Sequence, residues 1–94
     1  MTETIYICLL EPEGDLRCDC GVEVVGVFAT YEEAIKRALK EIDYDIQNND
    51  YVVDENEYKE FKEGNNMYVN VYYCYYENYD CYYSVSIIQE EVNF

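Results

Sequence analysis

Histidine and tryptophan are both absent from this chain of 94 residues, and lysine and arginine together number only six. The lack of an imidazole excludes Ser–His–Asp and Cys–His catalytic arrangements, the usual histidine metal sites and the commonest general base. The shortage of basic residues excludes direct binding to nucleic acid and to anionic membrane surfaces, because both attract proteins through lysine and arginine. The sequence therefore predicts neither a histidine-dependent enzyme nor a nucleic-acid-binding protein.

Long apolar runs are also missing, since no stretch approaches the roughly 18 apolar residues by which a membrane-spanning helix is recognised. The start of the chain lacks the basic segment of a secretory signal peptide, and its apolar residues 5–10 form too short a run. Five cysteines in a chain without an export signal are expected to be reduced thiols, and an odd number cannot all pair within one molecule. We therefore expect an intracellular, cytoplasmic protein with no membrane partner.

Acidic and apolar residues are abundant instead. Aspartate and glutamate number 21, so the formal net charge is −15, while hydrophobic residues make up 50% of the chain and aromatic residues 17%. A disordered acidic tail contains far fewer apolar residues, so this chain is expected to fold. Its length supports one hydrophobic core, and we expect a single domain over residues 1–94.

Two runs near the start of the chain have the composition of β-strands. Residues 4–10 are mostly apolar and are followed by a turn that contains Pro12, the only proline. Residues 22–28 are rich in β-branched side chains, and Gly26 within this run predicts a bulge or a close approach of another group to the backbone. We expect the two strands to pair antiparallel.

A helix is predicted to begin after Thr30, where the spacing of apolar residues becomes helical. Thr30 and Glu33 have the spacing of a capping box, in which the Thr30 hydroxyl accepts from the backbone N–H of Glu33. In the same motif the Glu33 carboxylate reaches back to the backbone N–H of Thr30. The helix is expected over residues 31–45, with an apolar stripe for the core formed by Ala34, Ile35, Ala38, Leu39 and Ile42.

The last third of the chain predicts a tyrosine-rich hairpin with strands at residues 67–76 and 81–89. Alternation places two sets of side chains on single faces: Val69, Val71 and Tyr73 in the first strand, and Tyr83, Val85 and Ile87 in the second. A register that brings these two sets onto one face of the sheet separates Cys74 from Cys81. No disulfide is therefore expected in the hairpin.

Together these patterns predict an α+β fold, with a single antiparallel sheet of about four strands and one helix packed on one face. The segment between the helix and the hairpin has weaker patterns. Residues 51–53 fit a short edge strand, and Tyr58 and Phe61 fit a helical turn.

The pair Cys18 and Cys20 is the one local pattern that resembles a metal site. Two thiolates at this spacing bind a soft ion only when two further ligands come from elsewhere in the fold. Asp19 between them raises the cost of forming the thiolates. We expect ordinary thiols, with no metal and no cofactor.

Acidic residues crowd the middle of the chain. Neighbours such as Asp43 and Asp45 would serve general acid–base catalysis only if burial separated their pKa values, and a charged run is normally solvated, so we expect no enzyme. Tyrosines beside carboxylates instead form a surface that suits a partner rich in arginine and lysine, because arginine stacks on rings and pairs with carboxylates. The candidate partner-binding residues are Asp43, Asp45, Asp50, Asp54, Glu55, Glu57, Tyr72, Tyr76, Glu77, Tyr79, Asp80 and Tyr82.

Residues 24–35, VVGVFATYEEAI, resemble the strand, turn and helix start of many small phage and bacterial proteins of undefined function. Those proteins typically begin with a strand like residues 5–9 and close with one like residues 83–87, and the motif carries no catalytic residue. In size, acidity and aromatic surface the chain also resembles phage-encoded anti-defence inhibitors, which include anti-CRISPR proteins and DNA mimics.

The resemblance implies a non-catalytic inhibitor, monomeric or homodimeric, that acts in the cytoplasm of a host cell. Its partner would be a CRISPR effector or another defence nuclease, whose basic nucleic-acid-binding surface the acidic chain occupies as a DNA mimic. The alternative is a small intracellular protein-binding or structural module that dimerises through its tyrosine-rich hairpin. The sequence leaves both open, because a large net charge also serves solubility alone.

Overall fold

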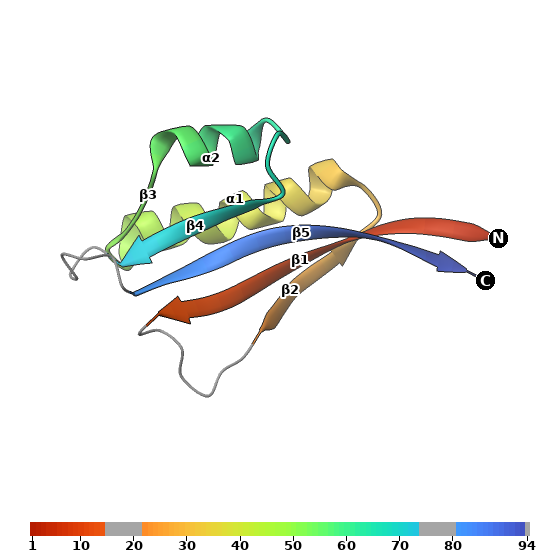
Figure 1. Cartoon of the computed structure of the whole chain (residues 1–94), viewed down its shortest axis with the longest axis horizontal. Helices are drawn as coiled ribbons and strands as arrows, with labels where there is room; N and C mark the ends of the chain where they lie inside the picture. Colours follow the sequence, from red (N-terminus) through yellow and green to blue (C-terminus); the bar gives the residue numbers. More distant parts are fainter. Residues whose placement is uncertain (15–21, 74–80, 94) are drawn as a thin grey trace.

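The computed structural model describes residues 1–14, 22–73 and 81–93. Its elements form an α+β fold in which one antiparallel sheet has the strand order β2-β1-β5-β4-β3 and two helices lie over it (Figure 1). The elements are β1 (Thr2–Gly14), β2 (Glu23–Phe28), α1 (Tyr31–Asn48), β3 (Tyr51–Val53), α2 (Glu55–Lys62), β4 (Tyr68–Tyr73) and β5 (Cys81–Asn93).

The predicted α+β class and antiparallel sheet are confirmed, but the sheet has five strands and there are two helices, where about four strands and one helix were predicted. The fifth strand is β3, which pairs with β4 from Tyr51 opposite Tyr73 to Val53 opposite Val71. The second helix is α2, which buries Tyr58 and exists as a regular helix because it packs on β4. Neither helix of the described ranges is long and apolar enough to cross a membrane.

Strands β1 and β2 pair antiparallel, as predicted. The turn predicted after residue 10 is wrong, because β1 pairs with β5 through Pro12 as far as Gly14. The bulge and the close approach, predicted as alternatives at Gly26, both occur. The register shifts between Cys8, which lies opposite Gly26, and Leu9, which lies opposite Val24. A Cβ atom on Gly26 would lie 2.6 Å from Cζ of Phe28, so the phenyl ring occupies the space above this glycine. The bulge and the ring together position β2 against α1.

Helix α1 begins at the predicted cap and runs three residues beyond the predicted end at residue 45. The Thr30 hydroxyl accepts from the backbone N–H of Glu33 at 3.2 Å, as expected. The return contact differs from the prediction, because the Glu33 carboxylate accepts from the Thr30 hydroxyl at 3.1 Å and not from the backbone N–H of Thr30. The predicted stripe faces the sheet, and Ala34, Ala38 and Ile42 are fully buried.

The register between β4 and β5 is the one that the apolar pattern predicts. Val69 lies opposite Val85 and Val71 lies opposite Tyr83, so the two sets share the face that the helices cover. A register that joined Cys74 to Cys81 would have placed Val85 opposite Asn70, and the structure excludes it. The core that results contains Cys8, Ala34, Ile35, Ala38, Ile42, Tyr58, Phe61, Val69, Val71, Tyr83, Val85 and Ile87.

Candidate functional site

The predicted acidic residues of the middle segment gather at one end of the molecule. Between Lys40 and Lys59 the chain has seven acids and no basic residue. This segment contains the last turns of α1, all of β3 and the start of α2, which meet at the left of Figure 1. We call this region the acidic end, and its acids are Glu41, Asp43, Asp45, Asp50, Asp54, Glu55 and Glu57.

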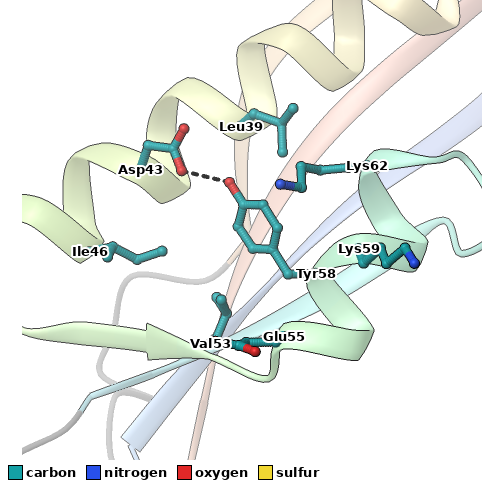
Figure 2. Close-up of a pocket in the computed structure, with 8 residues that line it drawn as sticks. All are labelled: Leu39, Asp43, Ile46, Val53, Glu55, Tyr58, Lys59 and Lys62. Carbon is teal, nitrogen blue, oxygen red and sulfur yellow. Dashed lines mark hydrogen bonds between the residues drawn. The ribbon is translucent and has the colours of Figure 1, made fainter.

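Asp43 joins the two helices. Its exposed carboxylate accepts a hydrogen bond of 2.6 Å from the hydroxyl of Tyr58, whose ring lies between α1 and α2 (Figure 2). Burial, and then the hydrogen bond to Asp43, raise the pKa of Tyr58 above its ordinary value. The hydroxyl therefore stays protonated at neutral pH and holds the carboxylate in one orientation.

Asp45 joins α1 to the sheet in the same way. Its half-buried carboxylate accepts from the hydroxyl of Tyr83 in β5, and its Oδ1 atom also accepts from the side-chain amide of Asn49 at 2.8 Å. Burial, followed by the hydrogen bond to Asp45, raises the pKa of Tyr83 strongly. Sequence reasoning missed both tyrosine hydroxyls as partners of the acids.

Two further acids of the acidic end bind backbone groups. Asp54 is the N-cap of α2 and accepts from the backbone N–H of Glu57 at 3.0 Å. The half-buried Glu57 accepts from the backbone N–H of Asn70 in β4. Glu55 is exposed in the first turn of α2, and Asp50 is exposed in the turn before β3, with a φ of 59°. The fold thus holds Asp43, Asp45, Asp54 and Glu57 through hydrogen bonds to other elements or to the start of α2.

Helix electrostatics explains the charges on α2 but not those at the end of α1. The α2 helix has acids in its first turn and lysines in its last, which the helix dipole favours at those positions. The last turn of α1 has no basic residue, and Asp43 and Asp45 lie near this negative end of the dipole. These two acids oppose the dipole, so local helix stability does not account for them.

The described tyrosines divide between the two faces of the sheet. Tyr72 and Tyr82 are brought together as neighbours, with ring centroids 5.5 Å apart, on the face away from the helices. Tyr51 contacts Tyr83 on the helix-covered face, with centroids 5.3 Å apart, close to Asp45. Tyr72 and Tyr82, both predicted as partner-binding residues, therefore lie on the opposite face of the β3–β4–β5 part of the sheet from the acidic end.

The remaining predicted contact residues, namely Tyr76, Glu77, Tyr79 and Asp80, lie outside the described residues, as do Cys18, Cys20 and Cys74. Cys8 is a free, fully buried thiol, and burial raises its pKa to about 11. It is therefore protonated at neutral pH and unsuited to metal binding, which needs a thiolate. Within residues 1–14, 22–73 and 81–93 no group of histidine, cysteine, aspartate or glutamate is arranged to hold a metal ion.

A groove of about 360 Å³ separates α1 from α2 next to the acidic end (Figure 2). Its lining residues are Leu39, Asp43, Ile46, Val53, Glu55, Tyr58, Lys59 and Lys62. The ammonium of Lys62 lies 4.6 Å from the centroid of the Tyr58 ring. Because the rim carries charges of both signs above an apolar floor, the groove has the character of a solvated furrow between two helices.

Comparison of the chain with protein-family models, with curated proteins and with solved structures finds no match.

Proposed function

We propose that this chain is a non-catalytic acidic inhibitor that occupies a basic, nucleic-acid-binding surface of a host defence protein. The proposed partner is a CRISPR effector or another defence nuclease, and the proposed mode is DNA mimicry in the host cytoplasm. The observation that carries the proposal is the acidic end, where seven acids from a segment without basic residues lie at the junction of α1, β3 and α2. Arg37, which pairs with Glu41, and the lysines of the groove, Lys59 and Lys62, border this cluster.

A DNA mimic must present many negative charges in a fixed arrangement, because duplex DNA has about one charge per 1.7 Å of its axis. Carboxylates on free side chains lose conformational entropy when a partner orders them. The bonds from Tyr58 to Asp43 and from Tyr83 to Asp45 fix two carboxylates before binding. The second oxygen of the exposed Asp43 is open to an arginine, whereas both oxygens of the half-buried Asp45 already accept one hydrogen bond each.

The test measures binding to a panel of CRISPR effectors and other defence nucleases at about 50 mM salt, where ionic contacts are weakly screened. We expect binding that weakens steeply as salt is added and that competes with guide RNA or target DNA. The substitution pair Asp50→Asn with Glu55→Gln changes two exposed acids of the acidic end. It is expected to weaken binding by about tenfold, the equivalent of about 1.4 kcal/mol.

The matched control is Glu32→Gln with Glu91→Gln, which changes the net charge equally at exposed positions away from the acidic end. Its binding should stay within about twofold of the original, or about 0.4 kcal/mol. Equal losses in the two variants would show that net charge alone acts. Failure of every effector to bind would replace the inhibitor proposal with the binding-module alternative.

A further inference from the structure

The face of the sheet opposite the helices is uncovered in the described part of the chain. Cys8 and Ile87 lie opposite one another on β1 and β5, point toward the helices and are buried. By alternation Ile7, Leu9 and Ile88 point to the other side, which we call the open face. The fold thus has one covered and one uncovered sheet surface.

A continuous apolar patch crosses β2, β1 and β5 on the open face. Ile7 lies opposite both Val27 on β2 and Ile88 on β5, and Leu9 lies opposite Val24. Val24 and Val27 are 58% and 57% exposed, and Ile88 on the central strand is 38% exposed. The bulge at Gly26 contributes to this patch, because it turns Val24 outward while Val25 packs against the core.

The rest of the open face is polar or aromatic at its centre, and two exposed acids border that centre: Glu11 lies opposite Ser84, and Glu90 lies opposite Ile5. Ser84 donates to the side-chain oxygen of Asn70 at 2.6 Å, so these two groups satisfy each other. The rings of Tyr72 and Tyr82 pack beside them, tilted by 42° to each other. The basic residues of the described ranges all lie on the helices and are Lys36, Arg37, Lys40, Lys59 and Lys62.

We propose that the open face is the interface of a symmetric homodimer in which two sheets pack face to face. A strongly charged partner finds no opposite charge among the apolar side chains at the centre of this face. A second copy matches that centre with the same apolar side chains, and a two-fold axis places both helix layers on the outside. Glu11 and Glu90, which border the centre, add to the repulsion between two copies, and salt screens this repulsion. Sheets pack in this way at a separation of about 10 Å.

The size of the open face is compatible with a stable dimer. β1 and β5 have 13 residues each, β2 and β4 have six each, and β3 has three. At about 4.8 Å between strands and about 3.3 Å between residues, the sheet covers roughly 650 Å². This area is close to the about 800 Å² that each partner buries in a standard interface. Covering the patch also removes exposed apolar side chains from water.

Salt separates this proposal from the proposed function. Each copy has a net charge of −15, so the two copies repel and screening by salt should strengthen the dimer. Binding of the acidic end to a basic surface should weaken with salt. Either proposal can therefore fail without the other.

Sedimentation equilibrium of the full chain, at about 50 and about 500 mM NaCl, tests the proposal. We expect a monomer–dimer equilibrium whose dissociation constant falls as salt rises. Ile88→Glu, which places a charge on the central strand of the open face, should raise that constant by at least about tenfold, or about 1.4 kcal/mol. Gln47→Glu adds the same charge at an exposed position of α1 and should leave the constant within about twofold, or about 0.4 kcal/mol.

A second variant tests the same interface without an added charge, so that a folding defect in Ile88→Glu does not decide the result. Val24→Thr with Val27→Thr removes exposed apolar groups from the edge strand, keeps β-branched side chains and adds no charge. It should also weaken the dimer while its circular dichroism spectrum stays unchanged. A chain that remains monomeric at high concentration in high salt, or a dimer that none of the open-face changes weakens, overturns the proposal.

Discussion

Tyr58 and Tyr83 show how single hydroxyl groups connect the layers of this small fold. Each ring is buried in the core while its hydroxyl donates to a carboxylate of α1. Hydrogen bonds to charged groups typically stabilise a protein by about 1.5–3 kcal/mol. The bond from Tyr83 to the half-buried Asp45 should be the more important one, because water competes less strongly for that carboxylate than for the exposed Asp43.

The same two tyrosines predict a loss of stability at alkaline pH. Burial, followed by hydrogen bonding to aspartate, raises the pKa of both in the folded state, while the unfolded chain ionises near pH 10. Above about pH 10 the unfolded state therefore binds fewer protons, and the free energy of unfolding falls by up to about 1.4 kcal/mol per pH unit for each tyrosine. Urea unfolding followed from about pH 8 to about pH 11 measures this slope.

Tyr83→Phe isolates one contribution to the alkaline slope. The variant should be less stable at neutral pH and should lose stability less steeply above about pH 10, since one titrating group is gone. Tyr44→Phe is the control, because Tyr44 is 61% exposed. Cys8, whose pKa in the folded state is about 11, also titrates in this pH range. It does so in both variants, so its contribution to the two slopes is the same. Equal slopes in the two variants would contradict the assignment.

At the scale of elements, the position of β2 depends on the close contact between Gly26 and Phe28. The ring of Phe28 fills the space that a side chain at Gly26 would need. Both residues face α1, since Gly26 lies opposite the buried Cys8 and Phe28 lies opposite Tyr6. The glycine is required here for close packing, and the bulge beside it sets which valines reach the open face.

Gly26→Ala is therefore expected to destabilise the protein, by about 1–3 kcal/mol, because the new methyl group displaces the Phe28 ring. Phe28→Leu removes the aromatic atoms that the methyl group meets. The double variant should be less destabilised than the sum of the two single variants, and denaturant unfolding of all four proteins measures this coupling. Additive effects would show that alanine is disfavoured by the bulge itself.

The accuracy of sequence reasoning also depends on the type of element. The α1 helix and the β4–β5 register were predictable, because a capping box, a long apolar stripe and two alternating strands each supply several consistent positions. The three-residue β3 and the eight-residue α2 are too short for such repetition and are formed by packing on β4. At these positions the sequence indicated a short edge strand and a helical turn, but its patterns were too short to establish either.

The candidate site was predictable only in part, for a related reason. The run of acids is visible in the sequence because its members are close along the chain. Their tyrosine partners are distant, since Tyr58 is 15 residues from Asp43 and Tyr83 is 38 residues from Asp45. Such pairs become apparent only when the topology places α1 beside both α2 and β5.

At the scale of the whole molecule, the charges are distributed unevenly. The described basic residues all belong to the helices, and Arg37 forms an ion pair of 2.7 Å with Glu41. Lys59 and Lys62 line the groove beside the acidic end, and Glu11 and Glu90 border the apolar centre of the open face. The molecule thus has separate surfaces for an ionic and an apolar interaction.

This distribution predicts that salt stabilises the folded monomer. With 21 acids against six basic residues, repulsion among carboxylates opposes the compact state, and screening reduces it. Raising NaCl from about 10 to about 500 mM should increase the free energy of unfolding by about 1 kcal/mol and Tm by roughly 5 °C.

Thermal unfolding of Ile88→Glu at low protein concentration measures this effect without a contribution from dimer formation. Gln47→Glu, treated identically, checks that the response does not depend on where the added charge lies. If Tm falls with salt, attractive pairs such as Arg37–Glu41 outweigh the repulsion. If it rises, the acids are costly to the fold, and their concentration at one end then requires an explanation other than stability.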